Sequence, residues 1–260
     1  MSMRYLFVFI GIFFSFSLVG QSKKAQKDFF EFKVYEYKNQ EQEKMIDQFL
    51  AEAYIPYLKR KGVSKVGVFV SLANDTAVVK KLFVLVPYKK LSDIPLINKA
   101  MFSDEEVLKT GKAYLDATSE NSAYDRIIGS VLEGFRLYPS LTIPNLKGAF
   151  ADRVYELRSY ESASEKKYWK KVEMFNEGGE IELFSRLNFN AVFYAEVISG
   201  PTMPNLMYMT SFENMEDRNA HWKAFSNDPK WKELTSMKEY EKTVSKNVTL
   251  FLRPKSYSSY

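Results

Sequence analysis

The chain has 260 residues, with 37 Lys+Arg, 32 Asp+Glu, one His and no Cys, so its formal net charge is +5. The lack of cysteine excludes disulfides, thiolate metal sites and thiol nucleophiles, and one histidine excludes any site that needs two imidazoles from one chain. Apolar residues make up 46% and charged residues 27%, which is typical of a globular protein of one or two domains. The aromatic share of 16% is unusually high.

Residues 1–20 are typical of a secretory signal peptide. Arg4 supplies a positive charge, Tyr5 to Val19 form an apolar run, and Gly20 is a small residue at its end. We expect cleavage after Gly20 and no stable membrane span afterwards, with an uncleaved anchor as the alternative. Because an exported protein without cysteine suits a bacterium better than a eukaryotic exterior, the expected location is the periplasm or the cell exterior.

Hydrophobic periodicity then predicts a β-α-β-β-α-β order. Alternating aromatic and charged residues favour a first strand, and an apolar stripe at helical spacing favours a helix that ends at Gly62. Two strands around the Asn74-Asp75 turn form a hairpin, and two helical pieces follow, the second beginning at Ser103. The expected strands are 30–37, 65–72, 80–86 and 127–138, and the apolar stripe of the first helix runs from 45 to 58.

The same order begins again in the second half of the chain. Val34-Tyr35-Glu36-Tyr37 resembles Val154-Tyr155-Glu156-Leu157, and Phe83–Tyr88 matches Met207–Phe212, 124 positions later. The predicted elements are a strand at 154–160, a helix around 168–175, a hairpin of 190–199 and 206–212, helices at 215–225 and 229–234, and a strand at 247–253. We therefore predict two units, 28–138 and 152–254, joined by a linker at 139–151.

A β-α-β-β-α-β unit is ferredoxin-like, with an antiparallel sheet and both helices on one of its faces. Each unit therefore leaves one sheet face uncovered. We predict an α+β protein in which the two tandem sheets face each other and close a barrel, as in a dimeric α+β barrel, with the helices outside.

Residues 152–254 resemble the NIPSNAP family in the order and spacing of several motifs, whereas the first unit matches only in outline. The motifs are Val154-Tyr155-Glu156-Leu157-Arg158-Ser159-Tyr160, Phe212, Glu213, Arg218, His221-Trp222, Phe225, Asp228-Pro229, Trp231, and Leu252 with Pro254. The resemblance implies the dimeric α+β barrel fold. The family has no settled enzymatic activity, and more distant relatives of the fold include cofactor-free monooxygenases and haem enzymes, so the fold does not decide the function.

His221, the single imidazole, is the first candidate for a functional site. It is either a general base, a haem ligand or a hydrogen-bonding group in a pocket, or a structural histidine paired with Asp217 four residues earlier; we favour the structural role. Arg218 would handle protons or negative charge beside it.

Trp222, Phe225 and Trp231 recur near helical spacing, around a helix start where Asp228 caps and Pro229 occupies the first turn. They either pack helix on sheet, which we favour, or line a ligand pocket.

Glu156, Arg158 and Tyr160 alternate along one strand and so share a face. We expect this face to line the barrel interior and Tyr155 and Leu157 to lie under the helices. The charges form either a structural pair or a polar floor that orients an apolar ligand, with Glu36 as the counterpart in the first unit.

The chain lacks the motifs GxxxxGK[ST], GxGxxG and GxSxG. It also has no DxDxDG run, no Cys and one His, and part of its positive charge lies in the signal peptide and the segment after it. We therefore expect no cofactor, no metal and no nucleic-acid partner. The function we predict is non-catalytic binding of a small apolar or aromatic ligand, or of a protein partner. The alternative is a cofactor-independent monooxygenase-like enzyme that acts on a small aromatic substrate.

Overall fold

The computed structural model describes residues 26–260, and the predicted signal peptide lies outside this range. No helix within residues 26–260 combines the length and the hydrophobicity needed to cross a lipid bilayer.

The first unit contains four strands and the helices between them. In chain order these are β1 (Phe29–Tyr37), α1 (Gln40–Gln48), the π-helix η1 (Phe49–Tyr54), α2 (Ile55–Arg60), β2 (Gly67–Ser71), η2 (Leu72–Asp75), β3 (Lys80–Tyr88), α3 (Asp93–Ala100), η3 (Met101–Ser103), α4 (Glu105–Thr110), α5 (Lys112–Leu115) and β4 (Arg126–Gly134).

The second unit repeats this plan after a short 3₁₀ turn. Its elements are η4 (Phe150–Asp152), β5 (Val154–Glu161), α6 (Glu165–Asn176), α7 (Glu180–Arg186), β6 (Phe193–Ser199), β7 (Asn205–Phe212), α8 (Met215–Asn227), α9 (Pro229–Ser236), η5 (Lys238–Tyr240) and β8 (Lys246–Pro254).

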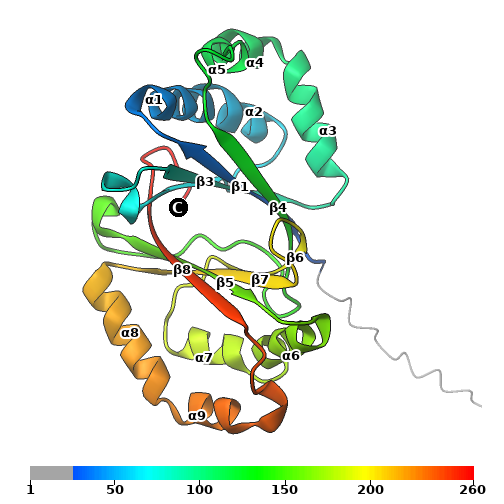
Figure 1. The fold of residues 1–260 in the computed structure, drawn as a ribbon, viewed down its shortest axis with the longest axis vertical. Helices are drawn as coiled ribbons and strands as arrows, with labels where there is room; N and C mark the ends of the chain where they lie inside the picture. The colour runs from blue at the N-terminus through cyan, green and yellow to red at the C-terminus, as the bar shows by residue number, and fades with distance from the viewer. Residues whose placement is uncertain (1–25) are drawn as a thin grey trace, which may run out of the picture.

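The strands of residues 26–260 form a closed, antiparallel eight-stranded barrel in the order β1-β3-β2-β8-β5-β7-β6-β4. Each unit contributes four neighbouring strands, and the seams between the units are the pairs β2–β8 and β4–β6. The helices of the two units cover opposite outer sides of the barrel (Figure 1). The predicted fold class is therefore confirmed, because two ferredoxin-like sheets meet edge to edge and enclose a common interior.

Helix starts follow the local chemistry of the sequence. Asp228 caps α9 by accepting a hydrogen bond from the Lys230 amide at 2.9 Å, and Pro229 is the first helical residue, as predicted. The cap of α4 is Asp104 and not Ser103, because the Asp104 carboxylate accepts the Val107 amide at 3.1 Å.

The barrel interior is apolar and aromatic, and this corrects the predicted orientation of β5. Tyr155 and Leu157 pack inside the barrel with side chains of the first unit, whereas Tyr160 belongs to the layer between sheet and helices of the second unit. Glu156 and Arg158 therefore face the helices. The physical reason is that a buried charge needs hydrogen-bond partners, and on the helix side Arg218 and Trp222 supply them to Glu156.

The strand registers also correct the predicted internal repeat. In β1, Phe32 pairs with Leu85, and in β5, Leu157 pairs with Met209. Since Leu85 and Met209 are equivalent positions of the repeat, Phe32 corresponds to Leu157, and Glu31 rather than Glu36 is the counterpart of Glu156.

The segment 139–151 runs past the barrel end, where Leu141 and Leu146 are buried in the interior cluster. The C-terminal residue Tyr260 joins the same cluster, with its ring 5.8 Å from that of Phe69.

Candidate functional site

In the second unit, Glu156 joins β5 to the helix α8. Its side chain has no exposed surface. One oxygen accepts Arg158 Nε at 2.6 Å and Arg218 Nη2 at 2.9 Å, and the other accepts Arg218 Nε and Trp222 Nε1, each at 2.7 Å. Four donors on one carboxylate leave it little capacity to bind anything else.

Charge and stacking extend this network. The guanidinium carbon of Arg158 lies 3.8 Å from the centroid of the Trp222 ring, and Arg158 Nη1 donates to the Tyr160 hydroxyl at 3.1 Å. Burial alone would raise the pKa of Glu156, but the hydrogen bonds and charges of Arg218 and Arg158 outweigh it and hold that pKa below its ordinary value. The carboxylate is therefore ionised at neutral pH and holds two cations together.

His221 lies on the flank of this network. Its Nδ1 is 2.8 Å from the main-chain oxygen of Asp217 and 3.2 Å from an Asp217 carboxylate oxygen, and its side chain is 22% exposed. The ring packs against Phe189 and Phe212, at centroid distances of 5.7 and 5.5 Å. This pairing with Asp217 is the arrangement expected of a structural histidine.

Phe225 and Trp231 pack behind Trp222. Phe225 is buried and lies 5.2 Å from Trp222 and 4.6 Å from Trp231, between ring centroids, while both tryptophans are half-buried. The structure thus brings Glu156, Arg158, Tyr160, Arg218 and Trp222 into one network and places the other three candidates around it. None of these eight candidate residues lines the cavity that the structure contains in the first unit.

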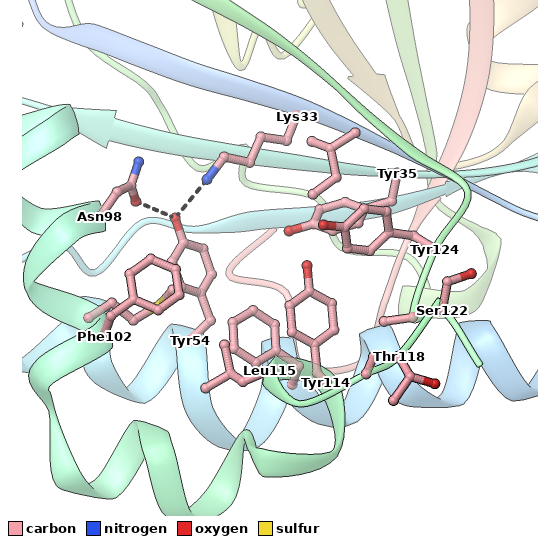
Figure 2. Close-up of a pocket in the computed structure, with 15 residues that line it drawn as sticks. Lys33, Tyr35, Tyr54, Asn98, Phe102, Tyr114, Leu115, Thr118, Ser122 and Tyr124 are labelled. Atoms are coloured by element: carbon pink, nitrogen blue, oxygen red, sulfur yellow. Dashed lines mark hydrogen bonds between the residues drawn. The ribbon is translucent and has the colours of Figure 1, made fainter. Parts of the chain in front are cut away.

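That cavity has a volume of about 470 Å³ and lies between the sheet and the helices of the first unit. A volume of this size falls within the range of small-molecule sites. Its walls come from β1, η1, α3, η3, α5, β4 and the loop between α5 and β4, and they are mainly aromatic or aliphatic (Figure 2). Phe102, which is 60% exposed, is at its edge and marks the side that faces solvent.

One end of the cavity is polar. Lys33 Nζ lies 3.3 Å from the Tyr54 hydroxyl and 3.1 Å from a Glu31 oxygen. The Tyr54 hydroxyl donates to Asn98 Oδ1 at 3.2 Å, and Asn98 Nδ2 donates to both Glu31 oxygens at 3.0 and 3.1 Å (Figure 2). Glu31 lies behind this group and neutralises Lys33, so the cavity presents an ammonium group, a hydroxyl and an amide.

The other end is lined by three tyrosines, Tyr35, Tyr114 and Tyr124 (Figure 2). Burial raises the pKa of Tyr35 to about 12, and burial together with the neighbouring Tyr35 hydroxyl also raises the pKa of Tyr114. The phenols of Tyr35 and Tyr114 are therefore neutral at physiological pH and act as hydrogen-bond donors and acceptors.

The π-helical turn η1 places two of the aromatic walls. Phe49 and Tyr54 begin and end this turn, and both line the cavity. Phe49 stacks on Tyr114 with a centroid distance of 3.9 Å, which connects η1 to α5. π-Helical turns are rare and occur frequently at functional sites.

Sequence reasoning missed this cavity because it concentrated on the second unit. The available signal was the alternation on β1, where the charged residues Glu31 and Lys33 alternate with buried Phe30 and Phe32. Charged residues on a strand with two buried faces point to a polar site on one of them.

The fold and this cavity define a class: a single-chain version of the dimeric α+β barrel with a ligand-sized space between helices and sheet. Residues 155–259 match the family model described as NIPSNAP, so the second unit is similar to that family, and the predicted resemblance is confirmed there. No curated protein sequence matches the chain.

Several solved structures share the fold. A candidate monooxygenase from Fusobacterium nucleatum subsp. nucleatum is 7% identical with a TM-score of 0.56, covering 88% of this chain and 93% of that one. A candidate monooxygenase from Lactobacillus acidophilus is 8% identical with a TM-score of 0.54, covering 88% and 94%. An uncharacterised NIPSNAP-like domain protein from Burkholderia xenovorans is 18% identical with a TM-score of 0.36, covering 42% and 91%. At these identities the likeness of the first two establishes the fold alone.

Proposed function

We propose that the chain is a non-catalytic binding protein whose first-unit cavity holds a small, flat, largely apolar aromatic molecule. The observation that carries this proposal is the apolar and aromatic cavity with one polar end, formed by Lys33, Tyr54 and Asn98. A pocket with apolar walls and a few convergent polar groups buries a ring and orients one polar substituent. A small molecule fits a pocket of this size, whereas a protein partner would need a broad surface.

The side chains around the cavity favour binding over catalysis. Lys33 is paired with Glu31, and the tyrosines with raised pKa values keep their protons. Among the described residues that line the cavity there is no carboxylate and no imidazole that could serve as a general base at neutral pH. His221 is on the other unit, held by Asp217.

The experiment is calorimetric titration with a panel of one- to three-ring aromatic compounds. Ala117 lines the cavity, so Ala117→Trp should fill it and abolish binding. Ala224→Trp, on the exposed surface of α8, is the matched control and should bind as wild type does. Equal binding by both variants, or no binding by the wild type, would refute the proposal.

A cofactor-independent oxygenase is the second candidate. Its support is the shared fold with two structures described as candidate monooxygenases. The reaction would take place in the same cavity, with dioxygen as oxidant and the phenols of Tyr35 and Tyr114 as hydrogen-bonding groups. Consumption of dioxygen that depends on a bound aromatic compound, and that Ala117→Trp abolishes, would establish this candidate over simple binding.

Export to a bacterial periplasm or cell exterior is a further part of the proposal. It rests on the apolar run from Tyr5 to Val19 and the small residue Gly20. In this setting the protein would meet its ligand outside the cytoplasm.

A further inference from the structure

The two units carry the same charged motif in the same place. By strand register, Glu31, Lys33 and Tyr35 of β1 correspond to Glu156, Arg158 and Tyr160 of β5. In both units the acid and the base form an ion pair on the helix side of the sheet, at 3.1 Å for Lys33–Glu31 and 2.6 Å for Arg158–Glu156. The cavity of the first unit and the network of the second are therefore two versions of one site.

The helix after the third strand supplies a donor in both versions. Asn98 of α3 donates to Glu31, and Trp222 of α8 donates to Glu156. The two residues are 124 positions apart, the same spacing that relates β3 to β7. The difference lies in size, because the Trp222 side chain adds a bicyclic ring where Asn98 has only an amide.

The ring of Trp222 fills the second site. Arg158 lies over it at 3.8 Å from the centroid, and Phe184 and Phe189 meet it edge to face at 5.9 and 5.0 Å. Its Nε1 donates to the buried carboxylate of Glu156 at 2.7 Å. In the first unit, Lys33 and Asn98 instead border the open cavity.

We infer that the first-unit cavity takes a flat bicyclic heteroaromatic molecule with an N–H donor, and that this molecule lies against Lys33 as the indole of Trp222 lies against Arg158. The inference rests on the proposed function and adds the ligand class. An electron-rich indole-type ring is the best aromatic partner for a cation. Its N–H would meet the acceptors that line this end, Asn98 Oδ1 and the Tyr54 hydroxyl.

The remaining volume sets a further condition on the ligand. A cavity of about 470 Å³ is larger than an indole ring alone, so the molecule has room for a substituent. That substituent would extend toward Tyr35, Tyr114 and Tyr124, whose hydroxyls suit a carbonyl or hydroxyl group.

The test compares indole with benzothiophene, a ring of similar size and shape that lacks the N–H, by calorimetric titration of the full chain. We expect indole to bind roughly tenfold more tightly, since the difference is one buried hydrogen bond. Asn98→Trp should lose indole binding, because it copies the filled second site. Lys33→Arg should keep the affinity for indole, and Lys33→Leu should lower it by roughly tenfold. This pair of variants tests the contact between the ring and the cation even if Asn98→Trp fails to fold.

The outcomes separate the two proposals. If other aromatic compounds bind in the cavity but indole shows no advantage over benzothiophene, or if Lys33→Leu binds indole as wild type does, the ligand class is wrong and the binding function stands. If no aromatic compound binds, the proposed function fails and this inference fails with it.

Discussion

The carboxylate of Glu156 should be among the most important single side chains for the stability of the second unit. Glu156→Gln keeps the shape of the side chain but leaves Arg158 and Arg218 without their counter-charge, at 14% and 17% exposure. Breaking a buried ion pair by removing one partner costs about 3–5 kcal/mol, and the partial exposure of both arginines favours the lower end, about 3 kcal/mol. For a chain of this length, that corresponds to a fall in Tm of roughly 6–12 °C.

The pH dependence makes the test specific. Because the pKa of Glu156 is lowered in the folded protein, its ionised form stabilises the fold, and this contribution is complete above the ordinary value of 4.5. It is lost as the pH falls below 4.5 through the folded pKa, so the stability gap between wild type and Glu156→Gln should narrow there.

Urea denaturation at several pH values measures both quantities. The control is Glu52→Gln, at an exposed position of η1, which should change the free energy of unfolding by less than about 0.5 kcal/mol. A loss of under about 1 kcal/mol for Glu156→Gln, or a stability gap that does not change with pH, would show that the Glu156 charge does not stabilise the fold.

Three further predictions concern Trp222, Tyr35 and the cleavage site of the signal peptide. Trp222→Ala should destabilise the chain by about 3 kcal/mol in urea denaturation, since it removes a large ring and a hydrogen bond, and a loss below 1 kcal/mol would show that the ring is not packed as described. Because burial raises the pKa of Tyr35 to about 12, the folded protein keeps a proton that the unfolded chain loses above pH 10, so stability falls from pH 10 to 12; Tyr35→Phe should reduce this fall, and an unchanged slope would contradict it. Intact mass of the exported protein should correspond to a chain beginning at Gln21, and a mass that includes Met1 would overturn the cleavage site.

The fold was predictable because each element has a clear period. Apolar residues at helical spacing before Gly62 and alternation along β1 and β5 were enough to give the β-α-β-β-α-β order twice. The barrel followed from the uncovered sheet faces, since two apolar faces in one chain can cover each other.

The orientation of β5 was not predictable from alternation. A period of two shows that Glu156 and Arg158 share a face, but both faces of this strand are buried, one in the barrel and one under α8. Only the partner residues decide which face accepts the charges, and Arg218 lies far along the chain. The same uncertainty misaligned the repeat: the shared letters Val-Tyr-Glu aligned Glu36 with Glu156, whereas the strand registers make Glu31 the equivalent of Glu156.

The cavity depends on side-chain size at a few positions. Asn98 and Trp222 occupy the same place in their units, and the smaller residue leaves space that the larger one fills. The 124-residue spacing of the repeat relates Asn98 to Trp222 in the sequence, but only the structure shows that they donate to the equivalent residues Glu31 and Glu156.

The most direct measurement is native mass spectrometry of the wild type, Ala117→Trp and Ala224→Trp, each purified from its source cells and incubated with a small-molecule extract of those cells. We expect a non-covalent adduct of small-molecule mass on the wild type and on Ala224→Trp, and its loss from Ala117→Trp, whose new ring fills the first-unit cavity. A wild type without any adduct, or an adduct that Ala117→Trp retains, would contradict the claim that this cavity is the binding site.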